Sequence, residues 1–360
     1  MKKTNRIRKY IPTASLVIFL VGITAILCYV TAILYTPFAD FFNSTVSEWL
    51  RAVLSFLTGF LPFSLFELLL IFLLPLLVFA VVFSFFKKGA FARVRYAVSI
   101  ISIASLLIST YIFTFGIAYR ATPVREELGI SVSGEVDTER LAATFVKIQE
   151  EVNALSRGKD GAVSEMPYSL DELSDIISDA YLTLSENYPG ISGRASRVKP
   201  VVFSAVMSSM GITGIFSPFT GEANINIEYP DYSLPFTAAH EFAHQRGIAR
   251  EDEANFIAHL VCVSSEDEFV RYSGYLYLYE YLASALYSAD KELYSELAKA
   301  LSATARADIL ASREVSAKYS ESTLGKINDK ANDLYLKSNG TEGIISYNLV
   351  VLLAVEYYCG

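Results

Sequence analysis

Residues 240–259 read HEFAHQRGIAREDEANFIAH, and they contain all three histidines of the 360-residue chain. In a helix, positions i and i+4 share one face, so the imidazoles of His240 and His244 could bind one Zn²⁺ together. Glu241 would lie beside them, placed to deprotonate a water molecule at the open coordination position. The alternative is a helix with two solvent-facing histidines, but in so histidine-poor a chain the motif arises by chance with a probability on the order of one in a thousand. The stretch therefore predicts a metal-binding helix.

The third ligand is less clearly marked than the first two. A catalytic zinc takes three protein ligands and keeps a fourth position for water. Gly247 can end the first helix in a left-handed conformation and turn the chain back toward the metal. In the acidic helix start that follows, Glu251 is the preferred ligand, because Asn255 lies one turn later and could hydrogen-bond to it. Spacing leaves Glu253 and His259 open as alternatives.

A strand is predicted just before the metal-binding helix. Residues 222–229, EANINIEY, alternate strictly between polar and apolar or aromatic side chains, which is typical of an exposed or edge strand. An edge strand can align an extended peptide. Glu222 and Asn224 could therefore contact a substrate, although both could equally cap a turn.

Side chains that could stabilise an oxyanion follow the motif. The candidates for this donor role are Arg271, Tyr272 and Tyr275. Their segment is rich in tyrosine, and packing is the more common role for such side chains.

The rest of the chain divides into two unlike parts. Overall, 52% of the residues are hydrophobic and 19% are charged, a composition that disfavours an ordinary soluble protein. Three apolar segments are long enough to cross a bilayer core, which takes about 20 helical residues; they are residues 12–35, 61–86 and 96–119. Glu67 is the only charged residue within them. A cleaved signal peptide is disfavoured for the first segment, whose apolar stretch exceeds the roughly 7–15 residues of a signal core.

Basic residues predict the orientation of these spans. Five precede the first span and four fill the loop before the third, whereas Arg51 is alone in the first loop; the nine are Lys2, Lys3, Arg6, Arg8, Lys9, Lys87, Lys88, Arg93 and Arg95. We therefore expect a multi-pass protein of the cell membrane, with a cytoplasmic N-terminus and an extracytoplasmic C-terminal domain. Residues 36–60 mix large apolar and charged side chains, which predicts an amphipathic outer loop at the interface.

Residues 119–360 carry most of the acidic charge. Residues 1–118 hold ten of the 30 Lys and Arg and three of the 38 Asp and Glu, which leaves 20 basic and 35 acidic residues, a net charge of −15, for the remainder. Such a domain would repel phosphate, so nucleic acid is not an expected partner. The expected partners are the lipid bilayer and a peptide or protein substrate.

Helical and strand patterns both occur in the second part. Apolar residues recur at helical spacing in 137–156 and in 169–187, the latter behind a candidate cap at Ser169. The other expected elements are strands at 200–208 and 211–215, a turn at 218–221, a helix from about 236, and helical segments at 251–312, 315–336 and 345–358. The domain organisation that follows is an N-terminal three-helix transmembrane anchor, 1–119, and a helix-rich α+β zincin-like metallopeptidase domain, 120–360.

Two resemblances bear on the motif. Residues 251–258 resemble the Glu-x-x-x-Asp/Asn helix of gluzincin metallopeptidases, in which the first Glu is the third zinc ligand; this implies Glu251. The glycine three residues after the second histidine is similar to that of metzincins, but Arg250 stands in place of their third histidine.

Nearly the whole chain also resembles the bacterial family called domain of unknown function 3810. That family is uncharacterised, so the resemblance implies a membrane-anchored zinc peptidase and no particular substrate. Its motifs here are the three spans, Tyr119-Arg120, Pro218-Phe219-Thr220-Gly221-Glu222-Ala223-Asn224, the block from His240 to Asn255, Arg271-Tyr272-Ser273-Gly274-Tyr275, and Ser346-Tyr347.

The sequence thus predicts a membrane-anchored zinc-dependent peptidase that hydrolyses peptide bonds on the extracytoplasmic side, with Glu241 as general base. The alternative is a non-catalytic membrane protein whose structural zinc site binds a partner or a cell-envelope component; Glu241 argues against it, because holding the metal does not require that carboxylate. Intramembrane proteolysis is disfavoured because His240 and His244 lie far beyond the last span, among charged residues.

Overall fold

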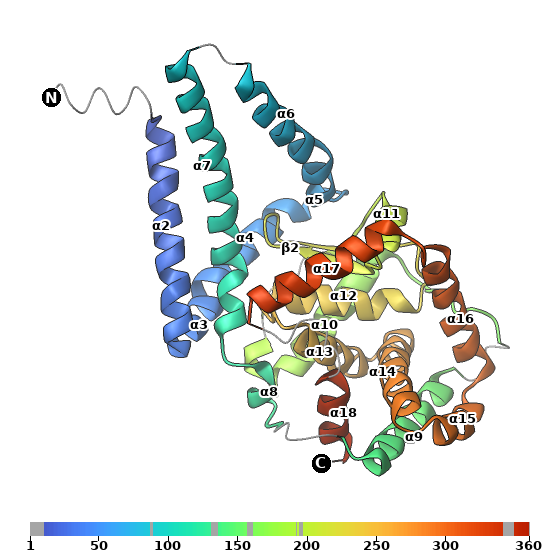
Figure 1. The fold of residues 1–360 in the computed structure, drawn as a ribbon. Helices are drawn as coiled ribbons and strands as arrows, with labels where there is room; N and C mark the ends of the chain where they lie inside the picture. The colour runs from blue at the N-terminus through green and yellow to red at the C-terminus, as the bar shows by residue number, and fades with distance from the viewer. Residues whose placement is uncertain are drawn as a thin grey trace. The chain divides into compact units, whose positions relative to one another are not determined.

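The computed structural model describes residues 11–86, 89–130, 136–156, 161–191, 193, 197–340 and 349–359 (Figure 1). The chain forms two compact units, one made of residues 1–122 with 217–221 and the other of 123–216 with 222–360. Several residues of the sequence argument lie outside the described ranges; they are the five basic residues before the first span, Lys87, Lys88 and the pair Ser346-Tyr347.

The first unit contains the predicted apolar spans. Three described helical segments are long and apolar enough to cross a membrane: Thr13–Leu34, Leu65–Phe85 and Phe91–Thr114. The first is α2, and the third lies in α7, Ala90–Thr114. The prediction of three helical segments long and apolar enough to cross a membrane is confirmed. The third begins and ends earlier than expected. It ends at Thr114 because the helix breaks at Phe115 and the chain continues as a short 3₁₀ turn, Gly116–Arg120.

The second span is not a uniform α-helix. It consists of α5, Leu65–Leu68, a π-helical turn, Leu69–Leu73, and α6, Leu74–Phe85. Pro75 has no backbone N–H to donate to the preceding turn, and its ring crowds that turn. A wider turn directly before the proline accommodates both effects.

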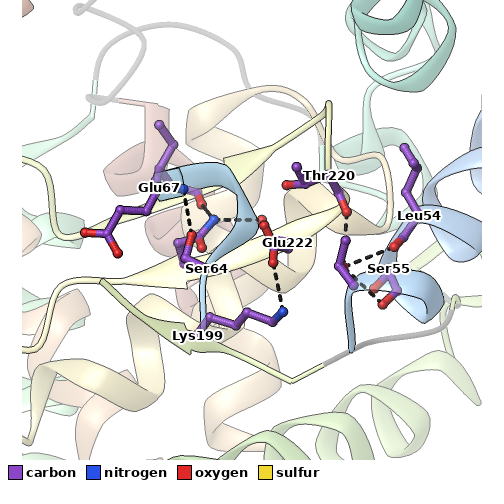
Figure 2. A network of polar contacts seen from close by, with 10 residues as sticks. Leu54, Ser55, Ser64, Glu67, Lys199, Thr220 and Glu222 are labelled. Atoms are coloured by element: carbon purple, nitrogen blue, oxygen red, sulfur yellow. Dashed lines mark hydrogen bonds and ion pairs between the residues drawn. The ribbon is translucent and has the colours of Figure 1, made fainter. Parts of the chain in front are cut away.

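The loop between the first two spans is helical, as its amphipathic pattern suggests. It forms α3, Thr36–Phe42, a π-helical turn, Asn43–Ser47, and α4, Glu48–Gly59. Arg51 is buried and donates to the carbonyl oxygen of Thr114 at the end of α7, at 2.7 Å, and to Asn43 Oδ1 at 3.1 Å. The Thr58 hydroxyl lies near the carbonyl oxygens of Leu54, Ser55 and Thr220, which ties α4 to the turn at 217–221 (Figure 2).

The second unit is mainly helical. Ser169 caps α10 as predicted, in a capping box with Glu172. The patterns at 137–156 and 169–187 are confirmed as α9 and α10, whereas the helical stretch at 251–312 is interrupted by turns. The helices are α8, Val124–Glu127; α9, Thr138–Leu155; α10, Leu170–Ser185; α11, Ser204–Ser209; α12, Ser233–Gln245; α13, Glu251–Val263; α14, Glu268–Ala289; α15, Lys291–Leu297; α16, Ala303–Lys318; α17, Thr323–Ser338; and α18, Leu349–Cys359.

A small sheet accompanies these helices. Its strands are β1, Lys199–Pro200, β2, Gly214–Ser217, and β3, Glu222–Ile225, in the order β1-β3-β2. β1 and β3 are parallel, with Lys199 opposite Asn224. The backbone N–H of Asn226 donates to the carbonyl oxygen of Thr213 at 2.8 Å, which continues the pairing of β3 with β2 beyond the strand ends.

Two strand predictions were wrong. The predicted strand at 200–208 has only its first residue in β1 and otherwise runs into α11, because pairing with β3 ends at Val201 and the hydroxyl of Ser204 bonds back to the Val201 carbonyl. The strand at 222–229 is neither exposed nor at an edge: β3 is buried and central. Its polar members tolerate burial because they have partners inside the sheet, described below.

The main hydrophobic core belongs to the second unit. α14 packs against α9, α12 and α13, and α18 packs against α9 and α13. The carboxylate of Glu356 on α18 accepts two hydrogen bonds from Arg140 on α9, both at 3.0 Å. α12 and α13, which carry the quoted motif, are therefore enclosed by other helices.

Candidate metal centre

Three side chains of the motif converge in the second unit. His240, His244 and Glu251 each offer a ligand atom, and these atoms all lie within 4.8 Å of one another. Nε2 of His240 is 3.3 Å from one carboxylate oxygen of Glu251, and Nε2 of His244 is 3.5 Å from the other. Among the described residues this is the group of His, Cys, Asp and Glu side chains that could hold a metal ion.

The helical spacing of the histidines is the reason that they meet. α12 runs from Ser233 to Gln245 and places His240 and His244 one turn apart, with ring centroids separated by 4.5 Å. Nearly every residue of this helix is buried, so the pair lies inside the unit rather than on a solvent-facing surface. This burial contradicts the alternative of two solvent-facing histidines.

The turn after α12 orients the second histidine. Gly247 has φ of 92°, the left-handed conformation expected of it, and the amide of Ile248 bonds back to the Ala243 carbonyl at 3.1 Å. The Ile248 carbonyl oxygen then lies 2.8 Å from Nδ1 of His244. Since a carbonyl can only accept, Nδ1 of His244 carries a proton, and Nε2 is the ring nitrogen directed at Glu251.

The same turn brings α13 back to the histidines, with Glu251 as its first residue. The two alternative ligands are engaged elsewhere. Glu253 accepts the backbone N–H of Val124 at 3.2 Å and lies 3.5 Å from Arg125. His259 has Nδ1 at 3.0 Å from the Gly274 carbonyl and Nε2 at 2.7 Å from the Tyr358 hydroxyl, so both its nitrogens are in use. The structure thus groups Glu251, and neither alternative, with the histidine pair.

The hydrogen bond predicted between Asn255 and Glu251 is not formed. Nδ2 of Asn255 is buried without a hydrogen-bond partner among the described residues. The physical reason is that each carboxylate oxygen of Glu251 is directed at a histidine instead.

Charge is strongly coupled within this group. Burial works against ionisation of Glu251, but the two histidines outweigh it and lower the pKa of its carboxyl well below the usual range. Burial likewise opposes protonation of His244, yet Glu251 raises the pKa of that imidazole to about 9. The carboxylate is therefore anionic and favours positive charge beside it.

Glu241 lies next to the ligand group in a confined site. Its carboxyl is buried, which raises its pKa to about 7 against the opposing effect of His240 and His244. The backbone N–H of Phe216 in β2 donates to this carboxyl, while Oε2 is buried without a partner among the described residues. β2 passes so close that a Cβ on Gly214 would be 2.5 Å from Glu241 Oε1.

The predicted site residues on β3, Glu222 and Asn224, contact the neighbouring strands of the sheet. Glu222 is buried and pairs with Lys199 of β1 at 2.8 Å (Figure 2). Nδ2 of Asn224 donates to the Ile215 carbonyl at 3.1 Å, in the neighbouring strand β2. Substrate contacts by these two residues stay a prediction, and the contacts described here are internal.

The candidates on α14 also have internal contacts. Arg271 donates to the Ser265 carbonyl at 2.9 Å, just before the helix. The Tyr272 side chain is buried, and its hydroxyl donates to Asp308 at 2.7 Å. The Tyr275 ring packs against His259, with centroids 5.7 Å apart. A role as oxyanion donor stays a prediction for all three.

Some contributors to the centre carry no recognisable signal in the sequence. The Ile248 carbonyl and the Phe216 amide act through the backbone, so their side chains do not mark them. Arg246 is buried with its guanidinium 3.6 Å from the Tyr181 ring centroid, and the Tyr181 hydroxyl donates to the Ala239 carbonyl at 2.7 Å. The contacts of Arg246 and Tyr181 therefore join α10 to the C-terminal half of α12, which carries the histidines.

Comparison with known proteins gives one result. A family model described as "Protein of unknown function (DUF3810)" matches residues 42–355, which include the whole centre. Neither the curated proteins nor the solved structures contain a match.

Proposed function

The chain belongs to the DUF3810 family, which has no assigned function, and we propose from the geometry of the centre that it is a membrane-anchored zinc-dependent peptidase with a zincin-like second unit. The observation that carries this proposal is the convergence of His240, His244 and Glu251 beside a buried glutamate, Glu241, that is not one of the three.

The residues present suit a zinc ion. Two imidazole nitrogens and one carboxylate oxygen form a donor set that catalytic zinc uses, and three protein ligands leave a position open. His244 is held in the tautomer that a ligand needs by the Ile248 carbonyl. The ionised Glu251 supplies the negative charge that a divalent cation requires.

Zinc, when bound, supplies a Lewis acid and lowers the pKa of coordinated water. We assign the proton transfers to Glu241. With one side of its carboxyl held by the Phe216 N–H, Oε2 is available to take a proton from water and later to deliver it to the leaving nitrogen. A pKa near 7 suits both halves of this exchange, because the group can accept and release the proton at neutral pH.

The location proposed for this reaction is the extracytoplasmic face of the cell membrane. Its support is the three apolar segments together with the basic residues that precede the first and the third, whereas the first loop contains a single basic residue, Arg51. A cysteine introduced at Ser178, on α10, would be labelled by an impermeant maleimide in intact cells, and one introduced at Lys87 would be labelled only after lysis. Labelling in the opposite pattern would overturn the orientation.

Metal analysis of the purified full-length protein tests the ligand set. We expect one equivalent of zinc in the unaltered chain, and a loss of 10-fold or more in zinc affinity in Glu251→Ala. Glu253→Gln is the matched control, since it alters a neighbouring carboxylate on the same helix and should keep its zinc. Undiminished zinc binding in Glu251→Ala would remove the ligand assignment.

Turnover tests the role of Glu241. Full-length protein in detergent would be presented with a library of short quenched peptides. Glu241→Gln should retain its zinc and lose roughly 10²–10⁴-fold in rate, the contribution of a positioned base. Unchanged hydrolysis in Glu241→Gln would exclude the proposed mechanism, and zinc binding without any hydrolysis by the unaltered protein would favour a structural metal site.

A further inference from the structure

Helix α17 departs from the burial pattern of its unit. Its apolar residues Leu324, Ile327 and Leu334 lie at spacings of three and seven, and so share one face of the helix. In an amphipathic helix of a soluble domain that face is normally buried. Here Leu334 is 71% exposed and Ile327 is 59% exposed, whereas Leu336 is the one buried residue of α17.

A second exposed apolar surface adjoins this helix. It consists of Val202, Phe203 and Val206, in and just before α11, and of Ile227 after β3, all about half exposed or more. The amide of Ile227 donates to the Ser204 hydroxyl at 3.3 Å, so these residues are contiguous.

α17 contacts the backbone at the C-terminal end of α11. Nδ2 of Asn328 donates to the Met210 carbonyl at 3.1 Å, and Gly325 packs closely on the Ser209 carbonyl. Figure 1 shows the two helices next to each other. We name the joint surface the α11/α17 face; its residues are Val202, Phe203, Val206, Ile227, Leu324, Ile327 and Leu334.

Charge distinguishes this face from the rest of the domain. Residues 119–360 carry a net charge of −15, yet residues 200–221 contain no charged side chain. On α17, three lysines, Lys326, Lys330 and Lys337, follow one another at spacings of four and seven along one border of the apolar stripe. Lys337 is paired with Asp333 at 2.7 Å, and the helix as a whole carries one more basic than acidic residue. Apolar side chains flanked by lysines are the arrangement with which an amphipathic helix lies in a lipid interface.

We propose that the α11/α17 face rests in the headgroup region of the membrane that the spanning helices enter. The second compact unit begins at Pro123, so only a few residues of chain separate it from the end of α7 at Thr114. An acidic domain is repelled by anionic lipids, and this repulsion is weakest at an apolar face bordered by lysines. The bilayer would thus bury apolar side chains that are about half exposed or more within their own unit.

Depth-dependent fluorescence quenching tests this proposal independently of any peptidase activity. Trp49 is the only tryptophan, so Trp49→Phe gives a background in which a single probe can be placed. Phe203→Trp puts the probe on the face. Tyr287→Trp is the control: it also replaces an exposed aromatic residue, 47% exposed against 53% for Phe203, and it lies at the end of α14 beside Tyr294.

Each full-length variant would be reconstituted in nanodiscs of ordinary lipid and of lipid brominated near the carbonyl end of the acyl chain. We expect brominated lipid to reduce the emission of Phe203→Trp by roughly half, at a depth of about 5–10 Å, and to leave Tyr287→Trp nearly unchanged. Equal quenching of the two probes overturns the proposal. A blue-shifted but unquenched Phe203→Trp emission also overturns it, because a protein partner or a second copy then covers the face.

A second variant keeps the test independent of the probe. Ile327→Asp places a carboxylate on the apolar stripe of α17, at an exposed position where folding should tolerate it. In the Phe203→Trp background it should at least halve the quenching, while thermal unfolding stays unchanged. Undiminished quenching would mean that α17 takes no part in the contact.

Discussion

The span Leu65–Phe85 and helix α13 both contain long runs of apolar residues, but these residues are exposed in the span and buried in α13. None of the residues in the most apolar window of the span is buried, whereas eleven of the thirteen residues of α13 are. In the span, apolar side chains face outward as they do toward lipid; in α13 they form the core, and polar residues such as Asp252 and Asn255 are enclosed with them. The solvent that each unit meets decides which side chains turn inward.

The two units also bury charge in different ways. Arg51, in the first unit, donates to carbonyl and amide oxygens, which carry no formal charge. Lys199, in the second, is paired with the carboxylate of Glu222 inside the sheet. A buried ion pair is costly to break on one side only, because the remaining charge has no solvent.

The largest effect that we predict breaks this pair. Lys199→Met should lower the free energy of unfolding of the second unit by about 3–5 kcal/mol, since the buried Glu222 would lose the cation with which it pairs. Lys199→Met combined with Glu222→Gln should recover most of the loss. Pulse proteolysis of the full-length chain in urea measures both, and a double variant as unstable as the single one would show that the pairing is not the cause.

A matched pair of truncations contrasts the two kinds of helix directly. Leu260 of α13 is fully buried and Leu76 of α6 is 59% exposed. Leu260→Ala should cost about 3 kcal/mol, the loss of transfer free energy plus a cavity. Leu76→Ala should cost less than about 1 kcal/mol in lipid, because no cavity forms beside fluid chains. Thermal unfolding in nanodiscs gives both values; equal costs would contradict a lipid-facing position for Leu76.

The tight packing around Glu241 gives a third test. Gly214→Ala would place a methyl group 2.5 Å from Glu241 Oε1, with Thr237 equally close. Displacing the carboxylate should lower peptide turnover by about 10²-fold at unchanged zinc content. Gly59→Ala in the first unit is the control, since its added methyl meets no atom within 4 Å. An unchanged rate in Gly214→Ala would mean that the site relaxes around the methyl group.

The smallest predicted effect concerns pH. Burial lowers the pKa of His259 to about 4, below its ordinary 6.5, so the folded unit holds this imidazole neutral. Its contribution to stability is present above pH 6.5 and is lost as pH falls from 6.5 toward 4; between about pH 7.5 and pH 5 the loss should be about 2 kcal/mol. Comparing the pH dependence of urea unfolding for the unaltered chain and His259→Gln isolates the contribution of His259 to the free energy of unfolding. Parallel pH profiles of the two proteins would refute this contribution.

The part of the centre that could be predicted from the sequence consists of residues close together in the chain. His240 and His244 meet because they are four residues apart on one helix, and Gly247 with the acidic start of α13 returns the chain to them. Spacing favoured Glu251 as the third ligand but could not exclude Glu253. The choice between them depends on how α13 rotates about its axis, and packing against α12 and α14 sets that rotation.

Features that depend on distant contacts were predicted less well. The alternation in residues 222–229 indicates an exposed strand only if its polar side chains have no internal partners, and Lys199 supplies one. The run at 200–208 has the β-branched composition of a buried strand, yet β3 pairs with only its first residues. A strand is defined by its neighbour, which a local pattern does not identify.

The sequence by itself determined the three apolar spans, the helical content of the second unit, and the two histidines with their adjacent glutamate, because hydrophobic length and helical periodicity are local properties. Only the tertiary structure decided that Glu251 completes the group, that the Phe216 amide and the Ile248 carbonyl hold Glu241 and His244, and that the apolar stripe of α17 stays exposed. These outcomes depend on which segments pack together, and the free energy of that packing is shared among residues far apart in the chain.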